Sequence, residues 1–105
     1  MRTRIMYIER KAGALTGEAR IGRVTFSRSG RTLRYRDLEL ARCSGYKFNH
    51  LEVQSGEEYW VSGPHRDGAD RLYGERLPVH VDENVRVEYW TEIRKLPNAV
   101  NRTRT

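Results

Sequence analysis

The sequence predicts a mainly β fold: a small antiparallel β-barrel, SH3-like or partly open, with one C-terminal α-helix. Three observations indicate this class. Short runs of β-forming residues alternate with turn sequences through residues 1–81. The one long helical periodicity follows them, at 82–96. The length of 105 residues is enough for one domain and too short for two, and we expect that domain to cover residues 1–97.

The first elements are a strand at 3–9 and a hairpin formed by 20–27 and 32–36. In the turn between the hairpin strands, Gly30 supplies the positive φ that such turns need. Apolar and polar residues alternate on both sides of this turn, so Ser27 is expected opposite Thr32. The register then sets four further pairs opposite each other: Phe26 and Leu33, Val24 and Tyr35, Thr25 and Arg34, and Arg23 and Arg36.

Four further strands are expected after the hairpin. They lie at 38–43, 46–54, 58–62 and 77–81, between turn sequences rich in Ser and Gly. The apolar alternation slips near Asn49-His50, which predicts a bulge there. Across the turn that contains Gly56, Leu51 is expected opposite Val61, and Val53 opposite Tyr59.

A helix is expected at 82–96, where it would act as a lid on the barrel. Asp82 stands in the N-cap position, and Pro97 stops the helix. Apolar residues recur at helical spacing and form one stripe: Val85, Tyr89, Ile93 and Leu96. Residues 98–105 are polar, and we expect them to form a flexible tail.

The segment 62–76 is predicted to be a long loop, because it contains three glycines, one proline and two aspartates. Loops of this length often carry function. Leu72 and Tyr73 are expected to dock the loop onto the barrel, while residues 65–70 protrude. The candidate interaction residues are His65, Arg66, Asp67, Asp70 and Arg71.

The chain is basic, with 17 Arg and 3 Lys against 14 acidic residues and a net charge of +6. Residues 1–50 carry 12 basic and 4 acidic side chains, whereas residues 51–105 carry 8 and 10. The positive charge is therefore concentrated in the first half. It favours a polyanionic partner, although an arginine-rich composition is an alternative explanation.

The hairpin register places Arg23, Arg34 and Arg36 together on one outer face as a cationic patch. Forked guanidinium groups bind phosphate and carboxylate, so these three residues are candidate contacts for an anion or a nucleic acid. Nearby carboxylates such as Asp37 and Glu39 are the alternative partners of the patch.

No pattern of catalytic or metal-binding residues stands out. Cys43, His50, His65 and His80 lack the paired spacing of zinc ligands, so we expect no metal and no cofactor. A Cys43–His50 nucleophile pair would lack a recognisable oxyanion hole. The carboxylates that could form an acid–base pair lie in turn sequences: Glu57, Glu58, Asp67 and Asp70. The sequence therefore predicts a protein that is not an enzyme.

Cysteine usage and hydropathy indicate the compartment. A single cysteine allows no internal disulfide. No apolar run approaches the length of a membrane span or of a secretory signal. We expect a cytoplasmic protein without a membrane partner.

Three stretches carry a resemblance to a known family: Met6–Lys11 with Ile21–Phe26, Tyr59–Pro64 leading to Asp70–Gly74, and Tyr89–Arg94. Together they resemble a family of small bacterial proteins of about this length with no established activity, and the match covers residues 5–97. Some relatives are named after 1-deoxy-D-xylulose-5-phosphate synthase. That enzyme needs several hundred residues and a Gly-Asp-Gly motif with a downstream Asn, neither of which this chain has.

These observations favour a non-enzymatic binding module with a cationic β face, for nucleic acid or another polyanion. The alternative is a protein-interaction or regulatory subunit that uses the 62–76 loop and exposed aromatic residues. The expected partner of the cationic face is a nucleic acid or an acidic protein.

Overall fold

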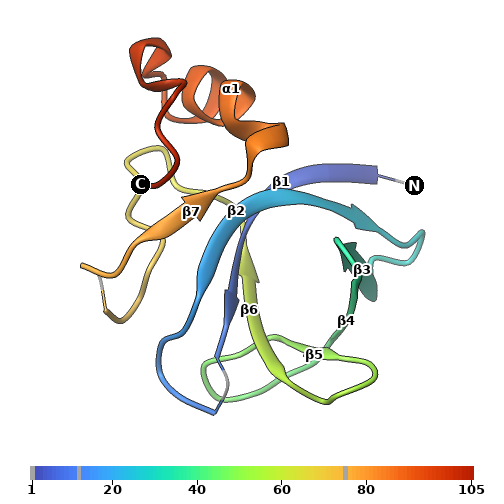
Figure 1. Cartoon of the computed structure of the whole chain (residues 1–105). Coiled ribbons are helices and arrows are strands. Elements are labelled where there is room, and N and C mark those ends of the chain that lie inside the picture. The colour runs from blue at the N-terminus through green and yellow to red at the C-terminus, as the bar shows by residue number, and fades with distance from the viewer. Residues whose placement is uncertain (1, 12, 75) are drawn as a thin grey trace.

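The computed structural model describes residues 2–11, 13–74 and 76–105. Its centre is a closed barrel of six antiparallel strands, in which neighbours in the sequence are neighbours in space (Figure 1). The barrel strands are β1 (Arg2–Arg10), β2 (Ala19–Phe26), β3 (Thr32–Tyr35), β4 (Leu38–Arg42), β5 (His50–Glu52) and β6 (Glu58–Ser62). The barrel closes because β1 pairs with both β2 and β6. The predicted mainly β class, a small antiparallel barrel with a C-terminal helix, is confirmed.

A seventh strand, β7 (Val79–Val81), lies outside the barrel and runs parallel to the start of β2. The strand β2 therefore has different partners along its length. Residues Ala19–Ile21 pair with β7, whereas only Thr25 and Phe26 pair with β3.

The barrel is filled by an inner core of alternate side chains from its strands. These are Met6, Ile8, Val24, Leu33, Tyr35, Leu40, Tyr59 and Val61. Alternation along a strand sends successive side chains to opposite faces. The residues between them in β1 and β2 therefore point out of the barrel.

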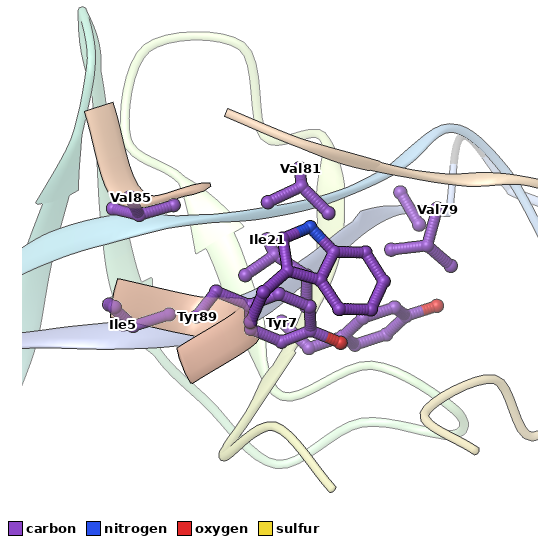
Figure 2. Close-up of a cluster of buried hydrophobic side chains, with 9 residues drawn as sticks. Ile5, Tyr7, Ile21, Val79, Val81, Val85 and Tyr89 are labelled. Atoms are coloured by element: carbon purple, nitrogen blue, oxygen red, sulfur yellow. The ribbon is translucent and has the colours of Figure 1, made fainter. Parts of the chain in front are cut away.

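Those outward residues belong to a second, outer core, which lies between the barrel wall and the C-terminal elements (Figure 2). It consists of Ile5, Tyr7, Ala19, Ile21, Val79, Val81, Val85, Tyr89 and Trp90. Because β1 contributes to both cores, five successive residues of it are buried, from Ile5 to Glu9.

The lid over the outer core is a helical segment of mixed geometry. It begins with a 3-10 turn (Glu83–Val85), continues through α1 (Arg86–Glu88) and widens into a π-helical turn (Tyr89–Ile93). The predicted helix 82–96 thus extends three residues too far at its C-terminal end. Lys95, at φ 56°, reverses the chain, and Leu96 is exposed.

The widened turn also changes which side chain is buried. Val85 and Tyr89 of the predicted stripe are fully buried, and Ile93 packs against the outer core. Trp90, which does not belong to the predicted stripe, is also fully buried in the outer core. Its indole Nε1 donates to the carbonyl of Arg102 at 3.0 Å.

Residues 98–105, predicted to be a flexible tail, pack along β7 and the lid. The amide of Val81 donates to the carbonyl of Thr103 at 2.8 Å, and the amide of Thr105 donates to the carbonyl of Val79 at 2.9 Å. Ala99 and Val100 pack against the outer core. The tail supplies the outer edge of β7 with hydrogen bonds.

The hairpin register is confirmed at the pairs Phe26–Leu33 and Thr25–Arg34, with Ser27 bonded to Thr32. The ladder ends there, so the predicted pairs Val24–Tyr35 and Arg23–Arg36 do not form. Here the ring of Tyr35 packs so closely over Gly22 that a Cβ at this position would lie 2.4 Å from that ring.

The predicted strand 46–54 and its pairing with β6 are wrong. Only His50–Glu52 is a strand, and Tyr46 is 80% exposed. Leu51 pairs with Glu58 in place of Val61. The side chain of Asn49 makes two hydrogen bonds to the backbone of Val61, at 2.8 and 2.9 Å, and so replaces a ladder pair.

Candidate polyanion-binding surface

Each arginine of the predicted cationic patch is paired with a carboxylate. Arg23 donates to Glu88 at 2.7 Å and Arg34 to Glu39 at 3.1 Å. Arg36 donates to Asp82 at 2.8 Å. The structure therefore does not bring these three residues together as a positive surface, because each positive charge is balanced by its partner.

Arg36 lies outside the ladder in the turn between β3 and β4, where its backbone adopts φ 53°. Its partner Asp82 is buried and also accepts a 2.5 Å hydrogen bond from the hydroxyl of Tyr35. Burial, and then this hydrogen bond, raises the pKa of Tyr35. Asp82 makes no side-chain capping bond to the helical segment, so its role is to bind the β3–β4 turn to the lid.

The predicted interaction loop divides into an exposed part and an anchored part. His65, Arg66 and Asp67 are exposed. Asp70 is buried and accepts a hydrogen bond from the amide of His65 at 2.7 Å. The side chain of Arg71 is only 4% exposed.

Arg71 connects the loop to the β1–β2 loop and to the residues that precede β7. It donates to the hydroxyl of Thr16 at 2.7 Å and to the carbonyls of Leu77 and Pro78. The predicted docking residues Leu72 and Tyr73 are instead exposed. Arg71 holds the loop in place of these apolar residues because its guanidinium can donate to several backbone carbonyls at once. An apolar side chain would leave those carbonyls without donors.

A different set of basic residues lies together without acidic partners. We call them the hairpin-end arginines: Arg2, Arg28, Arg31 and Arg42. In the described parts of the chain, none of the four forms an ion pair. All four are exposed, so their guanidinium groups face solvent.

Four strand ends and one turn bring the hairpin-end arginines close in space. Arg2 pairs with Phe26 across β1 and β2, and its guanidinium lies 5.1 Å from the centre of the Phe26 ring. The amide of Arg42 donates to the carbonyl of Arg31 at 2.8 Å. Figure 1 shows the start of β1 beside the β2–β3 turn that carries Arg28.

A cavity of about 350 Å³ opens among these residues. It is lined by Arg2, Arg28, Gly30 and the hydroxyl-bearing residues Ser27 and Ser29. Gly30 has φ 73° and its amide donates to the carbonyl of Ser27, so the turn is well defined. The surface combines guanidinium and hydroxyl donors without a carboxylate in the cavity lining.

Sequence reasoning missed this surface although a signal was present. The stretch 19–36 contains six arginines and no acidic residue. Counting charge cannot show which of the six find a carboxylate from elsewhere in the chain. Arg23 and Arg36 do so through residues 65 and 46 positions away, whereas Arg28 and Arg31 have no such partner in the part of the chain that the structure describes.

No family model matches the chain, and comparisons with curated proteins and with solved structures give no significant match. The chemistry of the protein is therefore inferred from its own residues. Within residues 2–11, 13–74 and 76–105, no three metal-ligating side chains lie close enough to hold an ion. No helical segment in those ranges has the length and hydrophobicity to span a bilayer.

The candidate nucleophile Cys43 is in an unfavourable environment for catalysis. Burial, and then the negative charge of Glu58, raises the pKa of its thiol, which disfavours the reactive thiolate. His50 is buried, and its Nδ1 lies 2.8 Å from the side-chain oxygen of Asn49. The histidine is thus engaged by its neighbour in the chain.

Proposed function

We propose that this protein is a non-enzymatic binding module that holds a nucleic acid on the hairpin-end arginines. The single observation that carries the proposal is the gathering of four exposed arginines without an ion-pair partner among the described residues. Six other arginines of the chain do form ion pairs: Arg10, Arg20, Arg23, Arg34, Arg36 and Arg71.

The donor types match a phosphate backbone. Guanidinium groups bind phosphate oxygens with two parallel hydrogen bonds, and serine hydroxyls add neutral donors to phosphate or sugar. The cavity between Arg2 and Arg28 contains both types. Phe26 packs against the inner core and has the Arg2 guanidinium over its ring, so the ring helps to position Arg2 for a phosphate contact.

The experiment compares two double variants with the same change in charge. Arg28→Gln with Arg31→Gln removes two hairpin-end arginines, whereas Arg23→Gln with Arg34→Gln removes two ion-paired arginines. Binding of a fluorescent single-stranded oligonucleotide is measured by anisotropy across a salt series. Each phosphate contact contributes about 0.7–0.9 to the slope of log affinity against log salt, so the first variant should lower that slope by about 1.5.

The matched variant, Arg23→Gln with Arg34→Gln, should keep a slope close to that of the unmodified chain. Equal losses in the two variants would show that net charge alone drives binding. No binding of the oligonucleotide at 50 mM salt would reject the proposal outright.

A second function, protein interaction, is favoured by an apolar surface beside the 62–76 loop. Tyr46 and Leu72 are 80% and 63% exposed. The ammonium of Lys47 lies 4.5 Å from the ring centres of both Tyr46 and Tyr73, which brings the two tyrosines together. Tyr46→Ser with Leu72→Ser would abolish capture of a protein partner and leave oligonucleotide binding unchanged, which separates the two functions.

A further inference from the structure

The end of the barrel opposite the hairpin-end arginines contains a cavity of about 290 Å³. Its walls are the last inward-facing side chains of the inner core, namely Ile8, Tyr35 and Tyr59, together with Leu38. The cavity is therefore a continuation of the barrel interior to the surface. Its volume is at the lower limit of ligand pockets, which suits a ligand with a single ring.

Tyr59 is a polar group without a partner in this cavity. Its side chain is only 5% exposed, and its hydroxyl makes no hydrogen bond to any described residue. Tyr35, the other tyrosine of the wall, donates its hydroxyl to Asp82. The Tyr59 hydroxyl is not one of the fully buried polar atoms that lack a partner. It reaches the surface of the cavity, where it can donate a hydrogen bond to a ligand.

The rim of the cavity carries three arginines and two carboxylates. Glu57 accepts from two of the three guanidinium nitrogens of Arg10. Arg20 is paired with Glu18 at 2.9 Å and with Asp82 at 3.5 Å. Arg36 uses one Nη atom for Asp82, and its side chain is 54% exposed. Asp37, the second rim carboxylate, is exposed in the turn.

Of the three rim arginines, Arg36 uses the fewest guanidinium nitrogens for partners among the described residues. Its remaining N–H groups make no hydrogen bond among the described residues, and its guanidinium lies 5.4 Å from the centre of the Tyr35 ring. The backbone holds Arg36 in the left-handed region, an uncommon conformation for a residue with a side chain. Arg36 lines both this cavity and a neighbouring one that Asp82 also lines, and the bond to Asp82 fixes the position of its guanidinium.

The geometry points to a binding site for a small aromatic carboxylate at this end of the barrel. The ring lies against Tyr35, Tyr59 and Leu38, and the carboxylate accepts from the hydroxyl of Tyr59 and from Arg36. Two donors and an apolar wall explain why a planar, singly charged ligand fits better than a bare ion. This site is separate from the proposed nucleic-acid surface, because it lies at the other end of the same strands.

The test is a titration with benzoate, followed by backbone amide shifts in a heteronuclear NMR spectrum. Saturable shifts are expected at residues around the cavity, including Leu38 and Tyr59. Benzyl alcohol, which has the ring without the charge, should bind at least fivefold more weakly. Inorganic phosphate, which has charge without a ring, should give no saturable shift at those residues.

Two substitutions assign the contacts. Tyr59→Phe removes only an unbonded hydroxyl, so the fold is kept, and benzoate affinity should fall about fivefold, the effect of one hydrogen bond. Arg36→Gln should weaken benzoate about tenfold or more. Tyr46→Phe and Arg34→Gln are the matched controls elsewhere on the surface and should leave affinity unchanged.

Equal affinity for benzyl alcohol and benzoate would show that the cavity is merely an apolar hollow. The proposal also fails if Tyr59→Phe binds benzoate as tightly as the unmodified chain, or if the shifts occur at the hairpin-end arginines instead.

Discussion

The buried carboxylate of Glu9 connects β1 to two loops. Glu9 is 1% exposed and accepts from the hydroxyl of Tyr7 at 2.7 Å, from Lys11 at 3.1 Å and from the amide of Gly17 at 3.0 Å. Arg71 of the long loop lies 3.5 Å from the same carboxylate. These donors give both oxygens of the buried carboxylate hydrogen-bond partners. Glu9 therefore ties the β1–β2 loop and the 62–76 loop to β1.

His50 provides a prediction at the residue scale, because it is buried in the barrel wall. Burial, and then the positive charge of Arg42, lowers the pKa of His50 below its ordinary value of 6.5. The unfolded chain binds a proton more readily than the folded chain. Stability is therefore complete above about pH 7 and is lost as the pH falls below 6.5.

Urea unfolding at a series of pH values checks this prediction. His50→Gln should remove the loss of stability between pH 6.5 and pH 5. His65→Gln, which changes an exposed histidine, should retain it. An unchanged pH profile in His50→Gln would contradict the assignment.

At the scale of elements, the lid is held mainly by the side chain of Trp90 and less by the predicted stripe of apolar residues. Trp90 is fully buried between the outer core and the C-terminal residues, with its ring edge-on to Tyr89 at 5.1 Å. The guanidinium of Arg102 lies 5.1 Å from the centre of the Trp90 ring. The lid and the C-terminal segment therefore depend on the same residue.

Trp90→Ala should lower the free energy of unfolding by about 3–5 kcal/mol, the usual cost of removing a buried tryptophan. Chemical denaturation followed by far-UV circular dichroism measures the loss. Val87→Ala in the same helical segment alters a side chain that is 65% exposed, and it should change stability by less than about 0.5 kcal/mol. Similar effects of both substitutions would show that the segment does not cover a core.

At the scale of the whole molecule, the two cores share their central strands. β1 and β2 supply side chains to the inner core through one face and to the outer core through the other. Unfolding of β1 or β2 would therefore disrupt both cores. We therefore expect the barrel and the lid to unfold together.

Leu40→Ala tests this coupling, because Leu40 is fully buried in the inner core and both tryptophans contact the outer core. The substitution should cost about 2–5 kcal/mol. Tryptophan fluorescence and far-UV circular dichroism should show the same shifted midpoint. Separate midpoints would mean that the outer core unfolds independently.

Much of the barrel could be predicted because its signals are local. Alternation of apolar residues identified β2, β3 and β6, and Gly30 marked the turn whose register the pair Phe26–Leu33 confirms. The β5–β6 register failed because it depends on side chains. Asn49 replaces a ladder pair, and the carboxylate of Glu52 accepts from the amides of Gln54 and Ser55 in the turn. No hydrophobic pattern records such bonds.

The sequence by itself determined the fold class, the strand alternation, the hairpin turn and the excess of arginine, because each depends on neighbouring residues or on composition. The tertiary structure decided which arginines keep an unpaired charge. The partners Glu88 and Asp82 lie 65 and 46 positions away from Arg23 and Arg36. Charge pairing depends on distance in space, which only barrel closure and the docking of the lid establish. For this reason the candidate binding surface lies at the end of the β2–β3 hairpin and not on the face that the sequence predicts.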